Sequence, residues 1–364
     1  MPRSSRLISL DALRGLTIAA MILVNSPGSW EHIYAPFKHK PWNGITPTDL
    51  IFPFFLFIVG VSIVLAYGRG LKPGTTRKDA VRKILWRALK IFIVGILLNL
   101  YPYFNFEELR VAGVLQRIAI VFAICGLAFL YLDFTKQVLL CVILLIGYWV
   151  AMALIPTPGY AQPMLEPGAN LAAWVDSWLL PGRMWQHTWD PEGLFSTIPA
   201  IATGISGMIA GKLLISKHPL EKKIKHLLLG GLISLAIGYL WSIHFPLNKN
   251  LWTSSYVMVT SGYAAIVLSI FMFLIDKKGN EKFARPFVIF GSNAITVYVL
   301  AWVAAFLFDT VNFGGASIQA HFMNLLTNHG FEPKLASLAY AFLYIALMYV
   351  PAWLLYRKKV FIKL

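Results

Sequence analysis

The segment FKHKPWNGITPTD, residues 37–49, separates two apolar stretches at 9–26 and 50–67. Each stretch is long enough to cross a bilayer, which takes about 20 mainly apolar residues in a helix. The segment between them is polar, is stiffened by Pro41 and Pro47, and carries His39. The sequence therefore predicts two membrane spans joined by a loop that holds a titratable imidazole at the membrane surface.

The composition extends this interpretation to the whole chain. Its 364 residues are 58% hydrophobic and 13% charged, with a mean hydropathy of +0.66, whereas soluble domains have about 25% charged residues. We predict an all-α, polytopic integral membrane protein with ten transmembrane helices, surrounded by membrane lipid. The spans are expected near residues 9–26, 50–67, 86–101, 113–132, 137–155, 194–214, 226–243, 254–275, 286–308 and 335–356, with 318–326 as a candidate eleventh, interfacial helix.

The positive charges indicate the orientation. Most of the 32 Lys and Arg residues fall in the two termini and in loops 68–87, 133–136, 212–225 and 276–285. The alternate loops hold only Lys38, Lys40, Arg110, Arg183, Lys249 and Lys334. Because cytoplasmic loops carry the excess of Lys and Arg, both termini are predicted to be cytoplasmic and His39 to face outward. This topology also explains the net charge of +16, so no nucleic-acid partner is expected.

The chain is expected to form a single transmembrane domain over residues 1–364. Its longest outward loops, 27–49, 156–193 and 309–334, leave room for a bulky ligand. Asp11 and Arg14 interrupt what would be the start of a cleavable signal peptide, so residues 1–27 are expected to stay as the first span. Cys125 and Cys141 lie inside apolar runs and the histidines lack metal-ligand spacing, so neither a disulfide framework nor a metal site is predicted.

The first span carries polar residues that are costly in a membrane, about 2.5–3.5 kcal/mol for each Asp or Arg. Asp11 and Arg14 are three residues apart and can pair on one helix face. Asn25 lies about three helical turns after Arg14, on the same face and about 16 Å along the axis. This stripe is predicted to connect the cytoplasmic side with the His39 loop; a helix contact with a cytoplasmic anchor is the plainer alternative.

His39 and Asp49 form a candidate catalytic pair. Imidazole suits proton transfer near neutral pH and can also be a nucleophile. Thr46, Thr48 and Asp49 are all suitable N-caps for the second span. Because a cap uses one carboxylate oxygen, Asp49 can cap the helix and orient His39 at once. A purely structural histidine is the alternative.

Two further residues are candidates for ligand contacts. Trp42 offers an apolar wall or a stacking face for a sugar. Arg117, at the outer end of the span 113–132, is a candidate to bind an anion or a carbonyl group. The alternatives for Arg117 are a snorkelling side chain or an ion pair with Glu107 or Glu108.

Several motifs occur in an order that resembles the heparan-α-glucosaminide N-acetyltransferase family, from about residue 6 to residue 300. They are LDALRGL (10–16), the end of the first span with Asn25, FKH (37–39), WNGIT (42–46), DLIFP (49–53), GVLQR (113–117), DPEG (190–193), KNLWTSSY (249–256) and GSNAI (291–295). The first motif alone is weak, because other multi-span acyltransferases share something like it, but the whole set is fairly specific.

The resemblance implies acetyl transfer across the membrane, from cytosolic acetyl-CoA to the amine of a terminal glucosamine on the far side. His39 matches the family's active-site histidine, as general base or transient acetyl carrier, and Asn25 matches a polar residue proposed to assist it. Trp42, Asn43, Arg117, Asp190 and Glu192 are the candidates for acceptor contacts. Arg14, Ser292 and Asn293 are polar at the inner membrane boundary and are the candidates for contacts with acetyl-CoA.

The sequence also departs from the animal lysosomal enzyme of this family. Lys40-Pro41 stands where that enzyme has a small, uncharged pair, and its large N-terminal region outside the membrane has no counterpart. We therefore expect a bacterial-type member in an inner membrane, with His39 on the periplasmic side and an acceptor that need not be heparan sulfate. The oligomeric state stays open, a homodimer being one option.

Two other functions compete with acetyl transfer. A transporter of amino sugars or oligosaccharides would explain the many spans, the polar stripe and the prolines within spans, Pro53, Pro199 and Pro286, although no internal repeat is visible. A non-catalytic scaffold would leave Asn25, His39 and Asp49 without a role.

Overall fold

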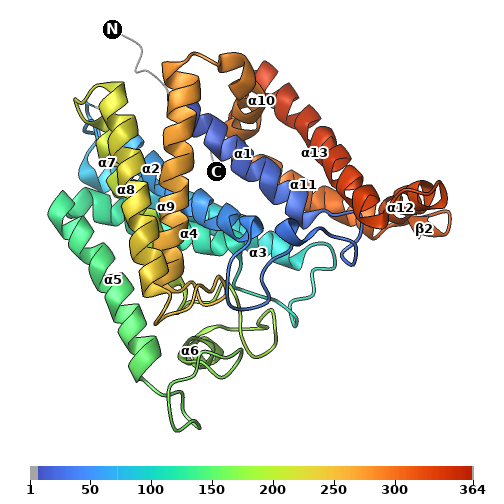
Figure 1. Cartoon of the computed structure of the whole chain (residues 1–364), viewed down its shortest axis with the longest axis horizontal. Helices are drawn as coiled ribbons and strands as arrows, with labels where there is room; N and C mark the ends of the chain where they lie inside the picture. The colour runs from blue at the N-terminus through green and yellow to red at the C-terminus, as the bar shows by residue number, and fades with distance from the viewer. Residues whose placement is uncertain (1–6, 72, 363–364) are drawn as a thin grey trace. The chain divides into compact units, whose positions relative to one another are not determined.

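The computed structural model describes residues 7–71 and 73–362 and divides the chain into two compact units (Figure 1). Unit 1 consists of Met1–Lys40, Thr46–Ile51 and Ile270–Leu364, and unit 2 of Pro41–Ile45 and Phe52–Ser269. Each unit has its own helical core, and the loop around His39 contributes residues to both.

Unit 1 is built on the first helix, α1 (Ile8–Asn25), which packs against three helices from the far end of the sequence. These are α10 (Glu281–Ser292), α11 (Ala294–Asp309) and α13 (Pro333–Arg357). The unit is completed by the 3₁₀ turns η1 (Ala35–Phe37) and η2 (Pro47–Leu50), the π-helical turn η3 (Met272–Lys277), strands β1 (Asn312–Phe313) and β2 (Ala316–Ser317), and helix α12 (Ile318–Asn328). The two strands pair antiparallel around Gly314 and Gly315.

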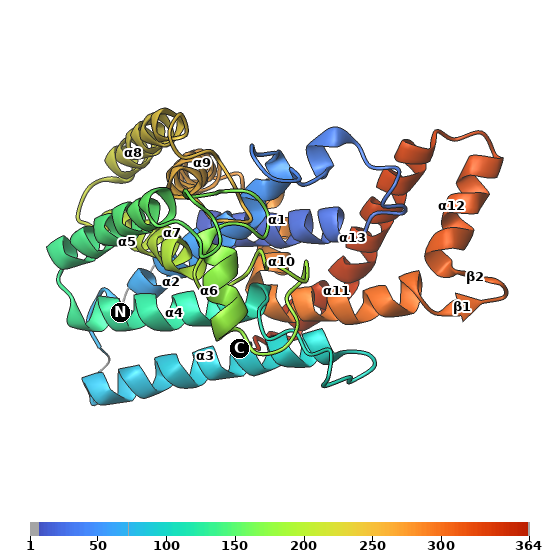
Figure 2. The ribbon, with the colours of Figure 1, turned by 90° about the horizontal axis from the view of Figure 1, so that it is seen from below.

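Unit 2 is arranged around α7 (Thr197–Ile215), which packs against α4, α5 and α8. Figure 2 shows α3 alongside α4, and α5 beside α7. The thiols of Cys125 and Cys141 are free and buried, facing the carbonyl oxygens of Ile201 and Ala202 of α7. The remaining helices are α2 (Ile51–Tyr67), α3 (Arg77–Leu100), α4 (Val114–Tyr131), α5 (Phe134–Leu154), α6 (Leu171–Leu179), α8 (Leu220–Trp241) and α9 (Ser254–Phe271).

Every predicted span coincides with a helix. Fewer of the described helices than the predicted ten, however, are long and apolar enough to be membrane spans. Among the described residues, eight helices are long and apolar enough to cross a membrane, and α10 with α11 makes a ninth if the pair is one broken span. Helix α3 is longer than predicted and opens with the charged turns around Arg77 and Lys83, so its apolar part alone resembles a span. The cytoplasmic placement of the termini remains a prediction.

The expected single span at 286–308 is wrong in one respect, because two helices bent by 72° replace it. Pro286 lies inside α10 and does not end that helix. The break falls at Asn293, whose backbone leaves the helical region and whose side chain is engaged elsewhere. Its amide donates to the Val360 carbonyl oxygen at 2.9 Å, and its oxygen accepts from the Ile362 N–H at 2.8 Å. The C-terminal segment is thereby bound to the break.

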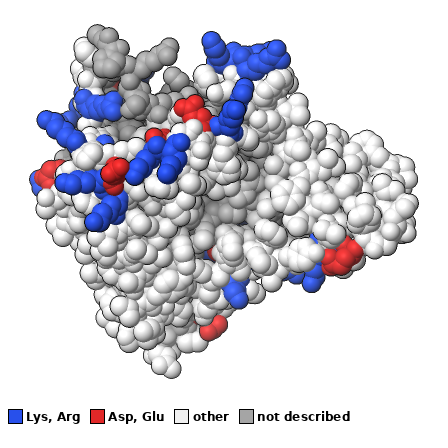
Figure 3. All heavy atoms as spheres, turned by 45° about the horizontal axis from the view of Figure 1, so that its top comes forward, with Lys and Arg blue, Asp and Glu red and all other residues white. Residues whose placement is uncertain are grey.

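The surface supports a membrane location. Figure 3 shows a face on which most atoms belong to uncharged residues, with Lys and Arg in small groups. On α5, the exposed residues Leu139, Ile143, Ile146 and Val150 recur at helical spacing on one side. An apolar stripe of this length facing outward is a liability in water and is the expected contact with lipid.

Helices α1 and α10 cross at two glycines. A Cβ atom on Gly15 would overlap the carbonyl oxygen of Phe287, and one on Gly291 would overlap the carbonyl oxygen of Asp11. Small residues allow backbones to approach this closely, which is how helices often associate in membranes.

We predict that Gly15→Ala destabilises the protein by about 1–3 kcal/mol, because the added methyl group forces α1 and α10 apart. The measurement is thermal unfolding in detergent. Gly147→Ala in α5 is the matched control, since no atom lies within 4 Å of a Cβ there. It should unfold at or above the wild-type temperature, because Ala favours a helix over Gly. Wild-type stability of Gly15→Ala would contradict the close crossing.

Candidate active site

The loop after α1 folds back on itself and places His39 beside Asp49. The hydroxyl of Thr48 donates to the Pro36 carbonyl oxygen at 3.1 Å, and that of Thr46 donates to the Lys38 carbonyl oxygen at 2.8 Å. These bonds tie the strand of chain before His39 to the 3₁₀ turn η2 that leads into α2. Hydrogen bonds of the loop's own side chains therefore bring His39 and Asp49 together, although they are ten residues apart in the sequence.

Nδ1 of His39 lies 2.6 Å from Oδ1 of Asp49. The Asp49 side chain is completely buried, whereas that of His39 is 44% exposed. An ionised carboxylate can only accept hydrogen bonds, so the proton of a neutral His39 resides on Nδ1. The lone pair is then on Nε2. A carboxylate that fixes the tautomer of a histidine in this way prepares Nε2 to take a proton or to attack a carbonyl carbon.

The second carboxylate oxygen of Asp49 accepts hydrogen bonds from the backbone of the loop. Oδ2 accepts from the Thr46 N–H at 2.9 Å and from the Lys40 N–H at 3.2 Å, and it lies 3.0 Å from the Thr46 hydroxyl oxygen. Asp49 contacts His39 as expected, but it serves the helix start as the third residue of a capping box. Thr46 rather than Asp49 is the N-cap of η2. The catalytic role of the pair stays a prediction.

Asn25 ends α1 in the same unit, as the helical prediction required. Its side chain is exposed and makes no hydrogen bond to any residue that the structure describes. Thr17 and Met21, the residues between Arg14 and Asn25 on the predicted stripe, are buried. The stripe is thus a packed helix face with polar ends.

The three residues expected to contact acetyl-CoA all form hydrogen bonds within unit 1. Nη1 of Arg14 donates to Oδ1 of Asp11 at 3.0 Å, which confirms the predicted pair, and to the carbonyl oxygen of Gly291 at 3.4 Å. A cation at the last carbonyls of α10 is favourably placed in the helix dipole. The Ser292 hydroxyl donates to Ile289, and Asn293 binds the C-terminal segment. Their role toward the donor stays a prediction.

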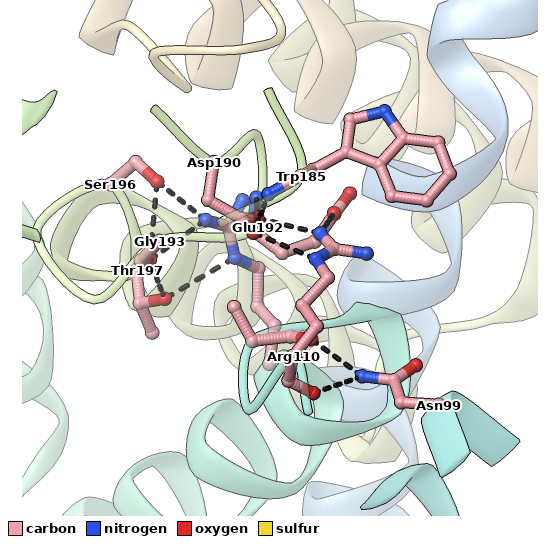
Figure 4. A network of polar contacts seen from close by, with 10 residues as sticks. Asn99, Arg110, Trp185, Asp190, Glu192, Gly193, Ser196 and Thr197 are labelled. Carbon is pink, nitrogen blue, oxygen red and sulfur yellow. Dashed lines mark hydrogen bonds and ion pairs between the residues drawn. The ribbon is translucent and has the colours of Figure 1, made fainter. Parts of the chain in front are cut away.

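In unit 2, Asp190 and Glu192 bind Arg110, a residue that the sequence did not single out (Figure 4). Nε and Nη2 of Arg110 donate to the two oxygens of Asp190 at 2.7 and 2.6 Å, and Nη2 also donates to Glu192. Burial would raise the pKa of Asp190, but the bonds and charge of Arg110 outweigh it and hold that pKa below its usual value. The Arg110 guanidinium also lies 5.1 Å from the ring centroid of Trp185. The signal that could have found Arg110 is its position as a rare cation among the loops that were predicted to face outward.

Arg117 is buried and neither snorkels nor pairs with Glu107 or Glu108. Its guanidinium donates to the Gly193 carbonyl oxygen at 3.0 Å and to the hydroxyls of Ser196 and Thr197. It also lies 5.0 Å from the ring centroid of Trp252. Nη1 has no hydrogen-bond partner in the part of the chain that the structure describes. The alternative ion pair fails because Glu108 pairs with Arg183.

Trp42 and Asn43 belong to unit 2 and are held by distant loops. The indole N–H of Trp42 donates to the Leu165 carbonyl oxygen at 2.9 Å, and its ring meets Trp189 edge to face. Asn43 accepts from the amide of Asn248 at 3.2 Å and pairs with it in an antiparallel bridge. The indole N–H is therefore satisfied, and the half-buried ring packs against the hydrophobic cluster of unit 2.

Comparison with known proteins decides the family. The model of the catalytic region of heparan-α-glucosaminide N-acetyltransferase matches residues 6–246. The chain belongs to this family. It is 30% identical to the human heparan-α-glucosaminide N-acetyltransferase and 29% identical to the mouse protein, with 99% of the chain aligned in each case. It spans 60% and 61% of the length of these two relatives.

The family match covers the residues of both described clusters. His39 and Asp49 lie inside the matched region, as do Arg110, Arg117 and the Asp190–Gly193 loop. Ser292 and Asn293 lie beyond it. The heparan-α-glucosaminide N-acetyltransferase family assignment, first indicated by the order of the motifs, is thus confirmed, whereas the roles of single residues are not tested by it.

Asp176 makes the stability of unit 2 depend on pH. It lies in α6, and burial raises its pKa to about 6, against the opposing hydrogen bond from the Phe195 N–H. A carboxyl group whose folded-state pKa is raised stabilises the fold while it is protonated, and this contribution is lost as the pH rises through the folded pKa.

We predict that the stability of the wild type relative to Asp176→Asn falls as the pH rises from the ordinary Asp value of 3.8 through about 6. Asn keeps an oxygen for the Phe195 N–H and never ionises. Melting temperatures of both proteins measured at several pH values across this window should shift in favour of Asp176→Asn. A difference that does not change with pH would show that Asp176 keeps its ordinary pKa.

Proposed function

We propose that this protein transfers an acetyl group from cytosolic acetyl-CoA to the amine of a glucosamine-type sugar on the outer side of the membrane. The observation that carries the proposal is the His39–Asp49 pair, in a loop between two apolar helices and within the region that matches the family model. The curated relatives are named as N-acetyltransferases. We further propose a bacterial inner membrane, with His39 on the periplasmic side.

In the direct mechanism, the acceptor amine attacks the thioester carbonyl carbon of acetyl-CoA while Nε2 of His39 removes a proton from the nitrogen. The C–S bond then breaks, coenzyme A leaves as the thiol after protonation, and the amide is formed. Asp49 stabilises the imidazolium that exists between these steps. General base catalysis of this kind contributes about 10²–10⁴-fold to a rate.

In the alternative mechanism, Nε2 of His39 attacks the thioester itself. Coenzyme A leaves first, the acetyl group stays on the imidazole, and the acceptor amine then takes it and restores His39. This order gives ping-pong kinetics, whereas the direct mechanism requires both substrates bound together. Both fit the tautomer that Asp49 imposes, and initial-rate kinetics with the two substrates varied separates them.

Asn25 and the cationic inner loops fit the same proposal. The Asn25 carboxamide is exposed at the end of α1 and is suited to donate to the oxyanion that forms on the thioester carbonyl. The loops 68–87, 212–225 and 276–285 are rich in Lys and Arg and would attract the phosphates of acetyl-CoA. Arg14 lies in the same helix as Asn25, nearer to its N-terminal end.

We predict that His39→Ala lowers the rate of sugar acetylation by about 10²-fold or more, as expected for loss of a base or nucleophile. Asp49→Asn should lower it as well, because its amide can donate to Nδ1 and favour the wrong tautomer. The assay uses purified protein, radiolabelled acetyl-CoA and glucosamine. His244→Ala, an exposed histidine of unit 2, is the control and should keep the wild-type rate. Full activity of His39→Ala would refute the assignment.

We also predict that Asn25→Ala lowers kcat by about 10²-fold, the usual effect of removing an oxyanion donor. Its melting temperature should equal that of the wild type, because the side chain is exposed and has no hydrogen bond in the described structure. Kinetics and thermal unfolding are measured on the same preparation. A parallel loss of stability would instead assign Asn25 to packing.

A transporter remains the second candidate, and the bend of 72° between α10 and α11 favours it. Discontinuous helices often line the substrate path of transporters. Proteoliposomes without acetyl-CoA distinguish the two functions. Under the enzyme proposal they take up no labelled glucosamine, whereas uptake that His39→Ala leaves unchanged, together with no acetylated sugar, would replace it with transport.

A further inference from the structure

The tripeptide Pro27-Gly28-Ser29, which follows the end of α1, is held by hydrogen bonds to α12 and α13 within unit 1. The Gly28 N–H donates to the Ser337 carbonyl oxygen at 3.2 Å. The Ser29 N–H donates to the Ser337 hydroxyl at 3.0 Å, and that hydroxyl lies 3.2 Å from the Ser29 carbonyl oxygen, to which it donates. From α12, the side-chain amide of Gln319 donates to the Pro27 carbonyl oxygen at 2.7 Å. Figure 2 shows the segment after α1 beside the N-terminal end of α13.

Gly28 lies at a contact that has no space for a side chain. A Cβ atom there would lie 2.9 Å from Cα of Ser337, 2.9 Å from Cβ of Tyr340 and 2.6 Å from the sulfur of Met323, all three of which are buried residues. Tyr340 is itself fixed, because its hydroxyl donates to Oδ1 of Asp309 at 2.8 Å. The two contacts on α13 cannot yield unless the helix moves. The loop and α13 are therefore packed backbone to backbone at Gly28.

The contact residues come from one face of each helix. Ser337 and Tyr340 are three residues apart in α13, and Gln319 and Met323 are four apart in α12, which places each pair on one helix face. The two helices pack against each other. We call these four residues the α12–α13 clamp. All of them lie beyond residue 246, outside the region that the family model matches.

The clamped segment begins two residues after Asn25, the candidate oxyanion donor. The Asn25 side chain is exposed and makes no hydrogen bond to any residue that the structure describes. Its location therefore depends on the backbone that carries it. The last bond of the helix, from the Ser26 N–H to the Ile22 carbonyl oxygen at 3.1 Å, fixes one side of Asn25, and the clamp fixes the chain on the other side. A misplacement of about 1 Å can cost about 10²-fold in rate, so an oxyanion donor depends on such support.

We propose that Gly28, Gln319 and Ser337 are positioning residues for Asn25. They fix the segment after α1 and thereby hold the Asn25 carboxamide where the oxyanion of the thioester forms. The inference rests on the proposed acetyl transfer and on the role proposed for Asn25. None of the three residues is a candidate for substrate contact, so they are expected to act on kcat and not on KM.

The test measures kcat, and KM for acetyl-CoA, with the full-length protein and glucosamine as the acceptor. Ser337→Ala removes the hydroxyl that bonds Ser29, and Gln319→Leu removes the donor to Pro27. Each should lower kcat by about five-fold or more, because the segment can then shift. KM should stay within about two-fold of the wild type, as expected when an interaction made only in the transition state is weakened. Gly28→Ala should lower kcat further, since its methyl group displaces the segment.

Ser269→Ala is the matched control. Ser269 is a buried serine of α9 in unit 2, and its hydroxyl donates to the Ile266 carbonyl oxygen of the same helix at 2.7 Å. This variant loses one buried hydroxyl, as Ser337→Ala does, without releasing a distant segment. It should keep the wild-type kcat.

Double variants separate positioning from a general loss of structure. If Ser337 and Gly28 act only through Asn25, adding Ser337→Ala or Gly28→Ala to Asn25→Ala should change kcat by less than about two-fold, because the carboxamide that they position is already gone. Losses that multiply would show that the clamp acts elsewhere and would overturn the inference. A wild-type kcat in both Ser337→Ala and Gln319→Leu would also overturn it, and these two variants suffice if Gly28→Ala does not fold.

The same assay distinguishes this inference from the proposed function. If the wild type acetylates glucosamine, His39→Ala does not, and the losses in the double variants multiply, acetyl transfer stands and positioning fails. If the wild type acetylates no amine, the proposed function fails and the positioning role fails with it. Amide hydrogen exchange then tests the clamp alone: the Ser29 N–H should exchange at least about ten-fold faster in Ser337→Ala than in the wild type. Equal exchange would overturn the clamp as well.

Discussion

The buried carboxylate of Asp49 is the constraint on which the candidate active site depends. A charged group with no solvent exposure is stable only when its oxygens are fully bonded. One oxygen meets His39, and the other collects the Thr46 and Lys40 donors. The same bonds therefore close the loop, start the turn that leads into α2, and fix the tautomer of His39.

The first helix connects this loop to the opposite end of unit 1. Its crossing with α10 has no space for side chains at Gly15 and Gly291, so the two backbones are in contact. Arg14 lies at this crossing and serves the end of α10, directly before the break at Asn293. A bent helix pair exposes backbone groups, and Arg14 donates to one of them, the Gly291 carbonyl oxygen. The side chain of Asn293 in turn binds the Val360 carbonyl oxygen and the Ile362 N–H of the C-terminal segment. The polar residues that were predicted to contact acetyl-CoA thus have a structural role in unit 1.

In unit 2, the side chains of two arginines form hydrogen bonds that stabilise a loop. Arg110 is neutralised by Asp190 and Glu192, and Arg117 is surrounded by a carbonyl oxygen, hydroxyls and an indole ring. Together they hold the 180–197 loop against the start of α4. The DPEG motif at residues 190–193 therefore stabilises this loop through its bonds to the two arginines. It is also a candidate for acceptor contacts. Arg117 differs from Arg110 because no carboxylate touches it, and one of its nitrogens has no partner in the described structure.

The sequence by itself determined the class of protein, the positions of the helices and the family. These follow from local properties: apolar length, the spacing of charges and the order of short motifs. It also predicted the Asp11–Arg14 pair and the proximity of Asp49 to His39, because both are contacts within a few turns or one loop. Tertiary structure alone decided the bend at Asn293, the partner of Arg110 and the surroundings of Arg117. Each of these depends on segments that are at least 67 residues apart in the chain, and no local pattern records which of them will meet.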